Sequence, residues 1–437
     1  MRKGSGSVRW LCRLFLLSAA VSAAGGWYYV DRSVPDRVSV VQNEKEEFIF
    51  SLPWMATLSS ESAQVSLGNQ SDIPADQITV EGRDLFSIYG DKLGSYQVGV
   101  RLLGLFKIKD IQVDVVETRY AMACGSPAGI YLKADGVMVI GTGRITDSEG
   151  IDREPAYGKL KSGDYIEAWN GVPLNTKEEL MDAVGNSRGE EAVLQIRRQG
   201  EDMEIPMQPV RCADGEYRLG AWVRDDTQGI GTITYVDENG NFAALGHGIS
   251  DSDTGELVET EEGAVYTTKI MEIEKGRAGT PGLLSGIIYY GPQSHLGTIR
   301  KNTEQGIFGT LDRQRLHEFQ GESMELARPQ EITEGPAVIR CQLEGETRDY
   351  TIEIEKVDLR AGKKNKSLVI RVTDPRLLEL TGGIVQGMSG SPIIQNGKLA
   401  GAVTHVFVQD ATRGYGILIE HMAEPQAAGA MSAERGK

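Results

Sequence analysis

The chain of 437 residues lacks most features of disulfide-stapled, metal-binding and nucleic-acid-binding proteins. Its four cysteines stand far apart, at positions 12, 124, 212 and 341, and form no Cys-x-x-Cys pair. Such spacing gives neither a disulfide framework nor a zinc site, so we expect no metal. The net charge of −16 argues against a nucleic-acid partner, because phosphate binding needs a basic face.

What the chain does contain favours a mainly β protein. It has 53 glycines, which suggest many tight turns, and runs in which Val, Ile or Thr alternate with polar residues. The length allows about three domains. We expect an apolar N-terminal segment (1–35), a small β-domain (36–120), a second β-domain (121–208), a C-terminal barrel or sandwich (209–425) and a frayed tail (426–437).

The N-terminus has the pattern of an export signal. Basic residues at positions 2, 3, 9 and 13 precede an apolar run that begins at Leu14, and aromatic residues follow at positions 27–29. This order predicts export across a membrane. Whether the segment is cleaved or stays as an anchor is left open, because the run is almost long enough to span a bilayer.

The segment 121–208 combines short strands with one well-marked helix. Thr176 and Glu179 form a capping box, and Leu180 and Val184 give the following helix an apolar face. The order of a Gly-Ile-Tyr-Leu loop, strands, an Asn-Gly turn and this helix resembles a PDZ domain. The resemblance implies that the backbone N–H groups of a loop bind a peptide C-terminus, and that the peptide adds as a strand. Those loop residues are Gly129, Ile130, Tyr131 and Leu132; the alternative is a β-domain that only spaces other parts of the chain.

The strongest chemical signal is the glycine-rich stretch around Ser389. A serine in Gly-Met-Ser-Gly between apolar runs is typical of a nucleophile on a tight turn. Small neighbours admit a substrate carbonyl, and the N–H groups of Gly387 and Ser389 can form an oxyanion hole. The alternative is a glycine-rich hairpin corner with a solvated serine.

A serine nucleophile needs a base, and the chain has five histidines. His247 is the first candidate, since the glycines on both sides suit an imidazole that meets a substrate. His405, on an apolar strand after Ser389, is the reserve base. The histidines in polar or loop surroundings carry little weight: His295, His317 and His421.

A third partner should be a carboxylate that orients the imidazole. Asp374 ends a strand shortly before Ser389, although an aspartate before proline is also a common turn former. The competing carboxylates are Asp251 and Asp253, which follow His247, and the more distant Asp312 and Asp410. Residue patterns alone do not decide among them.

Four stretches of the second half resemble the family of sporulation serine peptidases named for stage IV sporulation protein B. They cover 244–251, 383–399, 401–408 and 412–416. The resemblance implies a triad of His247, Asp374 and Ser389 on a fold similar to the chymotrypsin double β-barrel, with no cofactor. Chymotrypsin-like enzymes place the aspartate near the histidine, whereas Asp374 is close to the nucleophile in sequence.

The resemblance also implies a physiology. Such a peptidase is exported across the forespore membrane into the intermembrane space, anchored before cleavage, and cuts itself. It then cuts the regulatory subunit of a membrane-embedded protease complex, which triggers sigma-factor processing, while the PDZ domain binds the enzyme's own N-terminal segment. Two alternatives stay open: a non-catalytic exported PDZ adaptor, and a chaperone-like PDZ protease that acts on unfolded chains.

Overall fold

The computed structural model describes most of the chain after residue 33. The described ranges are 34–49, 56–60, 78–81, 85–102, 106–260, 262–319, 321–360 and 364–423, with a few positions before residue 30. The chain divides into one unit of residues 1–119 and 328–331 and a second of residues 120–327 and 332–437. Most of the predicted membrane segment (1–35) lies outside the described residues. No described helix combines the length and apolar character that crossing a bilayer requires.

The first unit is a small β-domain with two sheets. One sheet has the order β1 (Arg37–Val41), β7 (Phe106–Val116), β6 (Gly94–Leu102) and β3 (Ala56–Ser60), and the other has β2 (Lys45–Ile49), β5 (Leu85–Gly90) and β4 (Ile78–Glu81). Alternate residues of β7, such as Ile111, Val113 and Val115, are buried in its core. This is the period of two expected for a half-buried strand. The 3-10 helix η3 (Pro329–Glu331) also belongs to this unit.

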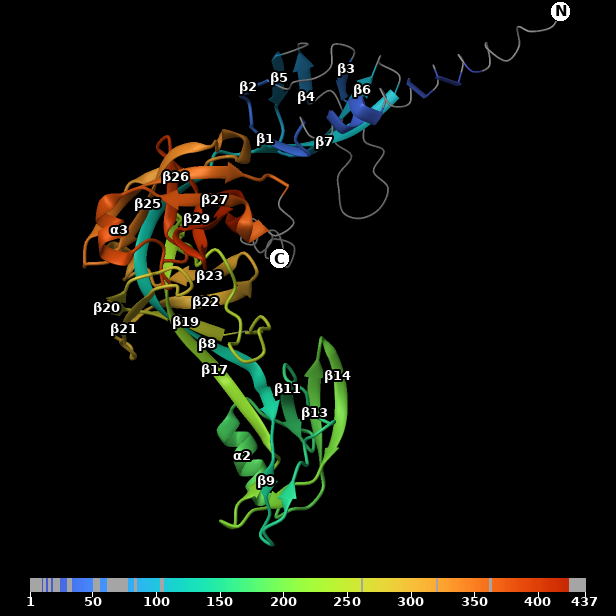
Figure 1. Ribbon diagram of the computed structural model, residues 1–437, viewed down its shortest axis with the longest axis vertical. Coiled ribbons are helices and arrows are strands. Elements are labelled where there is room, and N and C mark those ends of the chain that lie inside the picture. The colour runs from blue at the N-terminus through green and yellow to red at the C-terminus, as the bar shows by residue number, and fades with distance from the viewer. Residues whose placement is uncertain are drawn as a thin grey trace, which may run out of the picture. The chain divides into compact units, whose positions relative to one another are not determined.

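Two long strands organise the second unit. β8 (Tyr120–Thr142) and β17 (Ala221–Val236) pair antiparallel over most of their lengths, with several bulges (Figure 1). The end of β8 and the start of β17 belong to a globular part that we call the inserted unit, residues 137–223. The start of β8 and the end of β17 belong to a β-barrel. Two separate hydrophobic cores therefore share one pair of strands.

The inserted unit contains the predicted helix and short strands. Its sheet has the order β14 (Glu201–Met207), β13 (Ala192–Arg198), β11 (Tyr165–Trp169), β8 and β17. The remaining short strands are β9 (Ile145–Thr146), β10 (Asp152–Arg153), β12 (Val172–Pro173), β15 (Val210–Arg211) and β16 (Tyr217–Arg218). Helix α2 (Lys177–Asn186) begins after Thr176, and the predicted capping box with Glu179 is confirmed.

The packing corrects the predicted boundaries of the PDZ domain. Residues such as Ile130 and Leu132, inside the predicted range 121–208, pack in the core of the barrel. In contrast, Leu219 lies beyond that range but packs in the core of the inserted unit. No local pattern indicates that β8 continues through both cores, because its pairing partner β17 lies far away in the sequence.

The barrel part of the second unit contains two rings of strands. The first has the order β8, β17, β18 (Asn241–Ala244), β23 (Gly306–Leu311), β22 (His295–Thr303) and β19 (Glu262–Tyr266), and β19 returns to pair with β8. The second is a closed barrel of β25 (Gly335–Gln342), β26 (Thr347–Val357), β27 (Leu368–Val372), β30 (Asp410–Leu418), β29 (Lys398–Phe407) and β28 (Pro392–Gln395). The mainly β fold class is confirmed.

Short elements connect these rings. β20 (Thr268–Glu274) and β21 (Leu283–Ile288) form a hairpin, and β24 (Ser323–Glu325) pairs with the start of β8. The helical pieces are η2 (Leu316–Glu318), η4 (Lys364–Lys366) and α3 (Pro375–Thr381).

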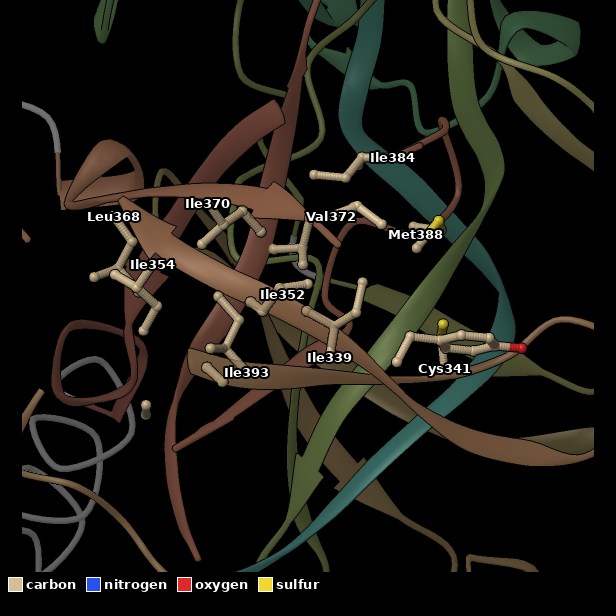
Figure 2. Packing of buried hydrophobic residues seen from close by; sticks show 14 of the residues in the cluster. Ile339, Cys341, Ile352, Ile354, Leu368, Ile370, Val372, Ile384, Met388 and Ile393 are labelled. Atoms are coloured by element: carbon tan, nitrogen blue, oxygen red, sulfur yellow. The ribbon is translucent and has the colours of Figure 1, made fainter. Parts of the chain in front are cut away.

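The core of the closed barrel also anchors the segment that leads to Ser389. Figure 2 shows the side chains of Ile384 and Met388 in the same cluster as Ile352 and Val372 of β26 and β27. Met388 is fully buried. The residue before the predicted nucleophile is therefore fixed by hydrophobic packing rather than held on a free loop.

The apolar face of α2 gives a test of the inserted unit. Leu180 is 4% exposed, whereas the neighbouring Met181 is 67% exposed. Replacing Leu180 with alanine should lower the free energy of unfolding by about 2–5 kcal/mol, because it leaves a cavity in the core. The matched change Met181→Ala should stay within about 0.5 kcal/mol. Urea denaturation followed by circular dichroism measures both, and equal effects would contradict this packing.

Candidate active site

Ser389 lies on a turn whose glycines have conformations that side chains rarely adopt. Gly387 has φ 99° and Gly390 has φ 96°. A Cβ on Gly390 would lie 2.1 Å from the carbonyl oxygen of Thr232, so no other residue fits without moving β17. The sequence pattern Gly-Met-Ser-Gly therefore reflects close packing of the turn against a neighbouring strand.

Two threonines of β17 hold this turn in place. The Thr232 hydroxyl donates to the Gly387 carbonyl at 2.9 Å, and the Thr232 N–H donates to the Ser389 carbonyl at 3.1 Å. The buried hydroxyl of Thr234 donates to the Gly390 carbonyl at 2.7 Å. These bonds join the first ring of strands to the nucleophile turn of the second. No sequence motif marks either threonine.

His247 reaches the same cleft from the first ring. Leu245 and Gly246 both have φ 69°, a sharp turn that ends β18 and directs the chain toward the second ring. A Cβ on Gly248 would lie 2.5 Å from the Thr303 carbonyl oxygen, which explains the glycine after His247. The flanking glycines thus have a packing role, in addition to leaving the imidazole accessible to a substrate as the sequence suggests.

A backbone hydrogen bond sets the tautomer of His247. Its Nδ1 lies 2.8 Å from the Gly248 carbonyl oxygen, and because a carbonyl only accepts, the proton is on Nδ1. Nε2 is then the proton acceptor of the neutral ring. Burial lowers the pKa of His247, so the ring is neutral near pH 7 and available as a base.

Strand β29 contacts the Ser389 hydroxyl and carries the second histidine, His405. Ser389 Oγ donates to the Thr404 carbonyl at 2.6 Å. The next residue, His405, has its ring centroid 4.8 Å from that of His247. In this arrangement the hydroxyl proton of Ser389 is directed at the Thr404 carbonyl and not at His247.

These groups line one cavity of about 440 Å³ between the two rings. Its wall contains the imidazoles of His247 and His405, and among the described residues no Asp, Glu, Lys or Arg lines it. Aliphatic side chains and proline make up much of the remaining wall: Ile130, Ile230, Leu245, Ile249, Pro281, Ile384, Val385, Val406 and Val408. The cavity suits an uncharged, apolar stretch of a ligand.

The predicted oxyanion hole faces this cavity. Gly387 and Ser389 both line it, and within the described residues neither N–H donates to a protein acceptor. Two amides of one turn that have no protein acceptor are suited to bind a developing oxyanion. Their assignment as an oxyanion hole stays a prediction.

Comparison with known proteins bears on this site directly. Residues 215–423 match the family model described as SpoIVB peptidase S55. The match covers just under half of the chain. The family is one of serine peptidases, so the chain is a hydrolase with a serine nucleophile, and the resemblance to sporulation peptidases is confirmed.

Other comparisons add little. A search of curated proteins gives no match. One similar solved structure is the PDZ domain of the SdrC-like protein from Listeria monocytogenes, at 18% identity and a TM-score of 0.17, covering 20% of this chain and 87% of that one. The PDZ interpretation of the inserted unit therefore depends on its own order of strands and helix.

The structure does not place Asp374 in the cavity that Ser389 and His247 line. Asp374 is the N-cap of α3, and its carboxylate accepts from the Arg376 N–H at 2.9 Å and the Thr351 N–H at 3.2 Å. The Arg376 guanidinium binds it as well, at 2.7 Å. An aspartate followed by proline is a strong helix-start signal, so the sequence contained the evidence for this role.

The competing carboxylates are also engaged elsewhere. Asp251 binds Arg224 and caps the turn at Asp253 and Thr254, and Asp253 binds the same arginine at 2.9 Å. Asp312 pairs with His295 at 2.8 Å, and Asp410 accepts from Thr412. None of them lines the cleft. Of the predicted site residues, the structure therefore brings together Ser389, His247, Gly387 and the reserve base His405.

The predicted carboxylate-binding loop requires a correction. Gly129, Ile130, Tyr131 and Leu132 lie inside β8, where they pair with β17 on one side and β19 on the other. A strand paired on both edges offers no N–H groups for an added peptide. Ile130 instead contributes to the wall of the catalytic cleft.

The role of Asp374 can be tested by an isosteric change. Arg376 lowers the pKa of Asp374 to about 2, so the carboxylate stabilises the fold above about pH 4, and this contribution is lost as the pH falls through about 2. Asp374→Asn should cost about 2 kcal/mol of stability at pH 7. The deficit relative to the unmodified chain should shrink as the pH is lowered from 5 toward 2.

The same variant separates a structural from a catalytic role. Asp374→Asn should label with a fluorophosphonate probe at close to the normal rate, because the side chain lies outside the cleft. Loss of a triad carboxylate typically lowers the rate by about 10⁴. A fall of that size in a folded Asp374→Asn protein would restore Asp374 to the triad.

Proposed function

We propose that the chain is a serine endopeptidase in which Ser389 attacks the peptide carbonyl and His247 acts as general base. The observation that carries this proposal is that both side chains face one cleft, with the proton of His247 fixed on Nδ1. The reaction begins when the Ser389 hydroxyl turns from Thr404 to Nε2 of His247. The N–H groups of Gly387 and Ser389 then stabilise the tetrahedral oxyanion.

The remaining steps use the same groups. His247, protonated on Nε2 in the attack, gives that proton to the departing amine, and the acyl-enzyme forms on Ser389. Water then enters, loses a proton to His247, and releases the carboxylic acid product. Glycines and small side chains around the nucleophile leave room for the main chain of an extended substrate.

The cleft also suggests the kind of peptide that is cut. Much of its wall is aliphatic, and none of the described residues that line it carries a charged side chain. An uncharged, apolar stretch of substrate next to the scissile bond therefore has the smallest cost of desolvation there. Charged residues at this position would be desolvated without a partner. We therefore assign the enzyme to apolar segments of protein chains.

For the physiology we propose the role that the S55 family suggests. The basic and apolar start of the chain supports export across the forespore membrane into the intermembrane space, with anchoring before cleavage. There the enzyme cleaves itself and then cuts the regulatory subunit of a membrane-embedded protease complex, which triggers sigma-factor processing.

Neighbouring serines provide a test of the nucleophile. Ser389 lines the cleft, whereas Ser391, two residues later, is fully buried and outside it. Ser389→Ala should abolish labelling by a fluorophosphonate and any self-cleavage followed by gel electrophoresis over time. Ser391→Ala should keep both activities. Labelling that persists in Ser389→Ala would reject the proposed nucleophile, and absence of both activities in the unmodified chain would favour the adaptor alternative.

A second candidate function is peptide binding by the inserted unit, at a different place from the one predicted. Residues 221–226 of β17 pair with β8 on one edge only, among the described residues. Helix α2 contacts β17, and Lys177 at its start binds Asp225 through both its N–H, at 2.9 Å, and its Nζ, at 2.8 Å. A peptide can add as a strand to that edge beside the helix.

The residues that precede this edge fit the same function. Gly220 has φ 68°, and a Cβ there would lie 2.8 Å from the Gly143 carbonyl oxygen. A tight glycine turn next to a free strand edge exposes backbone N–H groups of the kind that bind a peptide carboxylate. Trp222, 67% exposed on this edge, offers apolar contact to a bound peptide.

Hydrogen exchange can locate the peptide. The Ser389→Ala chain, which cannot cleave, is mixed with peptides that end in a free carboxylate or in an amide. We expect the free carboxylate form to slow exchange at 221–226 and in α2, and to leave 129–132 unchanged. Protection of 129–132 alone, or equal effects of the amidated peptide, would contradict this binding site.

A further inference from the structure

Within the part of the chain that the structure describes, the cleft proposed above is lined by Ser389 and two imidazoles, and by no carboxylate. In a Ser-His-Asp triad the carboxylate orients the imidazole and stabilises the imidazolium that forms during attack. Here the Gly248 carbonyl fixes the tautomer through Nδ1, but a neutral carbonyl compensates less charge than a carboxylate. Some other group must keep the His247 ring in position when it becomes charged.

His405 is the side chain placed to do this. Its ring centroid lies 4.8 Å from that of His247 with the planes tilted by 36°, so the two rings are in contact. Both rings line the cleft. A cation within about 6 Å of an aromatic face is stabilised by it, and the His247 imidazolium meets this distance.

The position of His405 on β29 adds a second connection. Thr404, one residue earlier, accepts the Ser389 hydroxyl through its carbonyl, at 2.6 Å. The Thr404 hydroxyl donates to the Asn365 carbonyl at 2.7 Å, which fixes this part of the strand. One short segment therefore holds the nucleophile through its backbone and contacts the base through the next side chain.

We propose that His405 is a positioning residue of the peptidase: its ring packs against His247, keeps Nε2 directed toward Ser389, and stabilises the imidazolium by contact with its face. The inference rests on the proposed roles of Ser389 and His247. His405 itself neither takes nor gives the proton. What it supplies is an aromatic ring on the strand that also holds the nucleophile.

The test compares a ring with a β-branched side chain at position 405. His405→Phe keeps an aromatic ring, whereas His405→Val removes it and suits a strand in which Val403 and Val406 are neighbours. His295, which pairs with Asp312 outside the cleft, supplies the matched control His295→Ala. Each full-length variant is first checked for cooperative unfolding at an unchanged midpoint.

The readout is the kinetics of labelling by an aryl fluorophosphonate, measured to saturation. We expect His405→Val to lower the limiting rate of labelling about three- to tenfold, which is the effect expected from the loss of one aromatic contact. The half-saturating probe concentration should stay unchanged. His405→Phe should stay within about twofold of the unmodified protein, as should His295→Ala.

The other outcomes overturn the proposal. An unchanged limiting rate in His405→Val shows that the ring is dispensable. Equal losses in His405→Val and His405→Phe show that a ring nitrogen is required, which would make His405 a proton-transfer group. Failure of the underlying function looks different, because Ser389→Ala or His247→Ala would then still label.

Discussion

The hydrogen bonds from Thr232 and Thr234 to the turn at 387–390 are the contacts on which the catalytic site depends. They place three donors of β17 against three backbone carbonyls of the turn that carries Ser389. Both threonines are nearly or fully buried, where an unmade hydrogen bond costs about 1–3 kcal/mol. The nucleophile is thus built from the second ring of strands but held by the first.

This arrangement links the inserted unit to the active site through one strand. β17 begins at Ala221 beside helix α2 and, through the bulge near Asp225, reaches Thr232 and Thr234 in the barrel. A ligand that adds to the free edge at 221–226 contacts the same strand that positions Ser389. Strands transmit small shifts along their hydrogen-bonded ladders, because a closely packed interior does not deform locally without moving its neighbours.

The sequence predicted those parts of the site that depend on local chemistry. The capping box of α2 and the glycines around Ser389 and His247 each reflect the backbone conformation of a few adjacent residues. The predictions that were wrong concern features that depend on contacts between distant parts of the chain. Residues 129–132 look like a loop before a strand. Only their pairing with β17 and β19, which follow much later in the chain, shows that they are a central strand.

Asp374 shows a different limit. Its place before Pro375 fits both a strand-end carboxylate directed at a cleft and a helix N-cap, and these roles exclude each other. The resemblance favoured the first, whereas the ion pair with Arg376 and the bond from Thr351 favour the second. His405 was only a reserve base, because nothing in the sequence predicts that two rings 158 positions apart lie in contact.

The cleft without a carboxylate has a consequence for when the enzyme is reactive. Burial lowers the pKa of His247, which opposes formation of the imidazolium, and the Ser389 hydroxyl is bound to Thr404 rather than to the base. In this arrangement the Ser389 hydroxyl is not aligned with a base. A substrate that occupies the apolar cleft close to Thr404 can displace the hydroxyl toward Nε2, so binding energy supplies the alignment. Under the proposed mechanism, such a site reacts faster with chains that fill the cleft than with peptides that contact it only briefly.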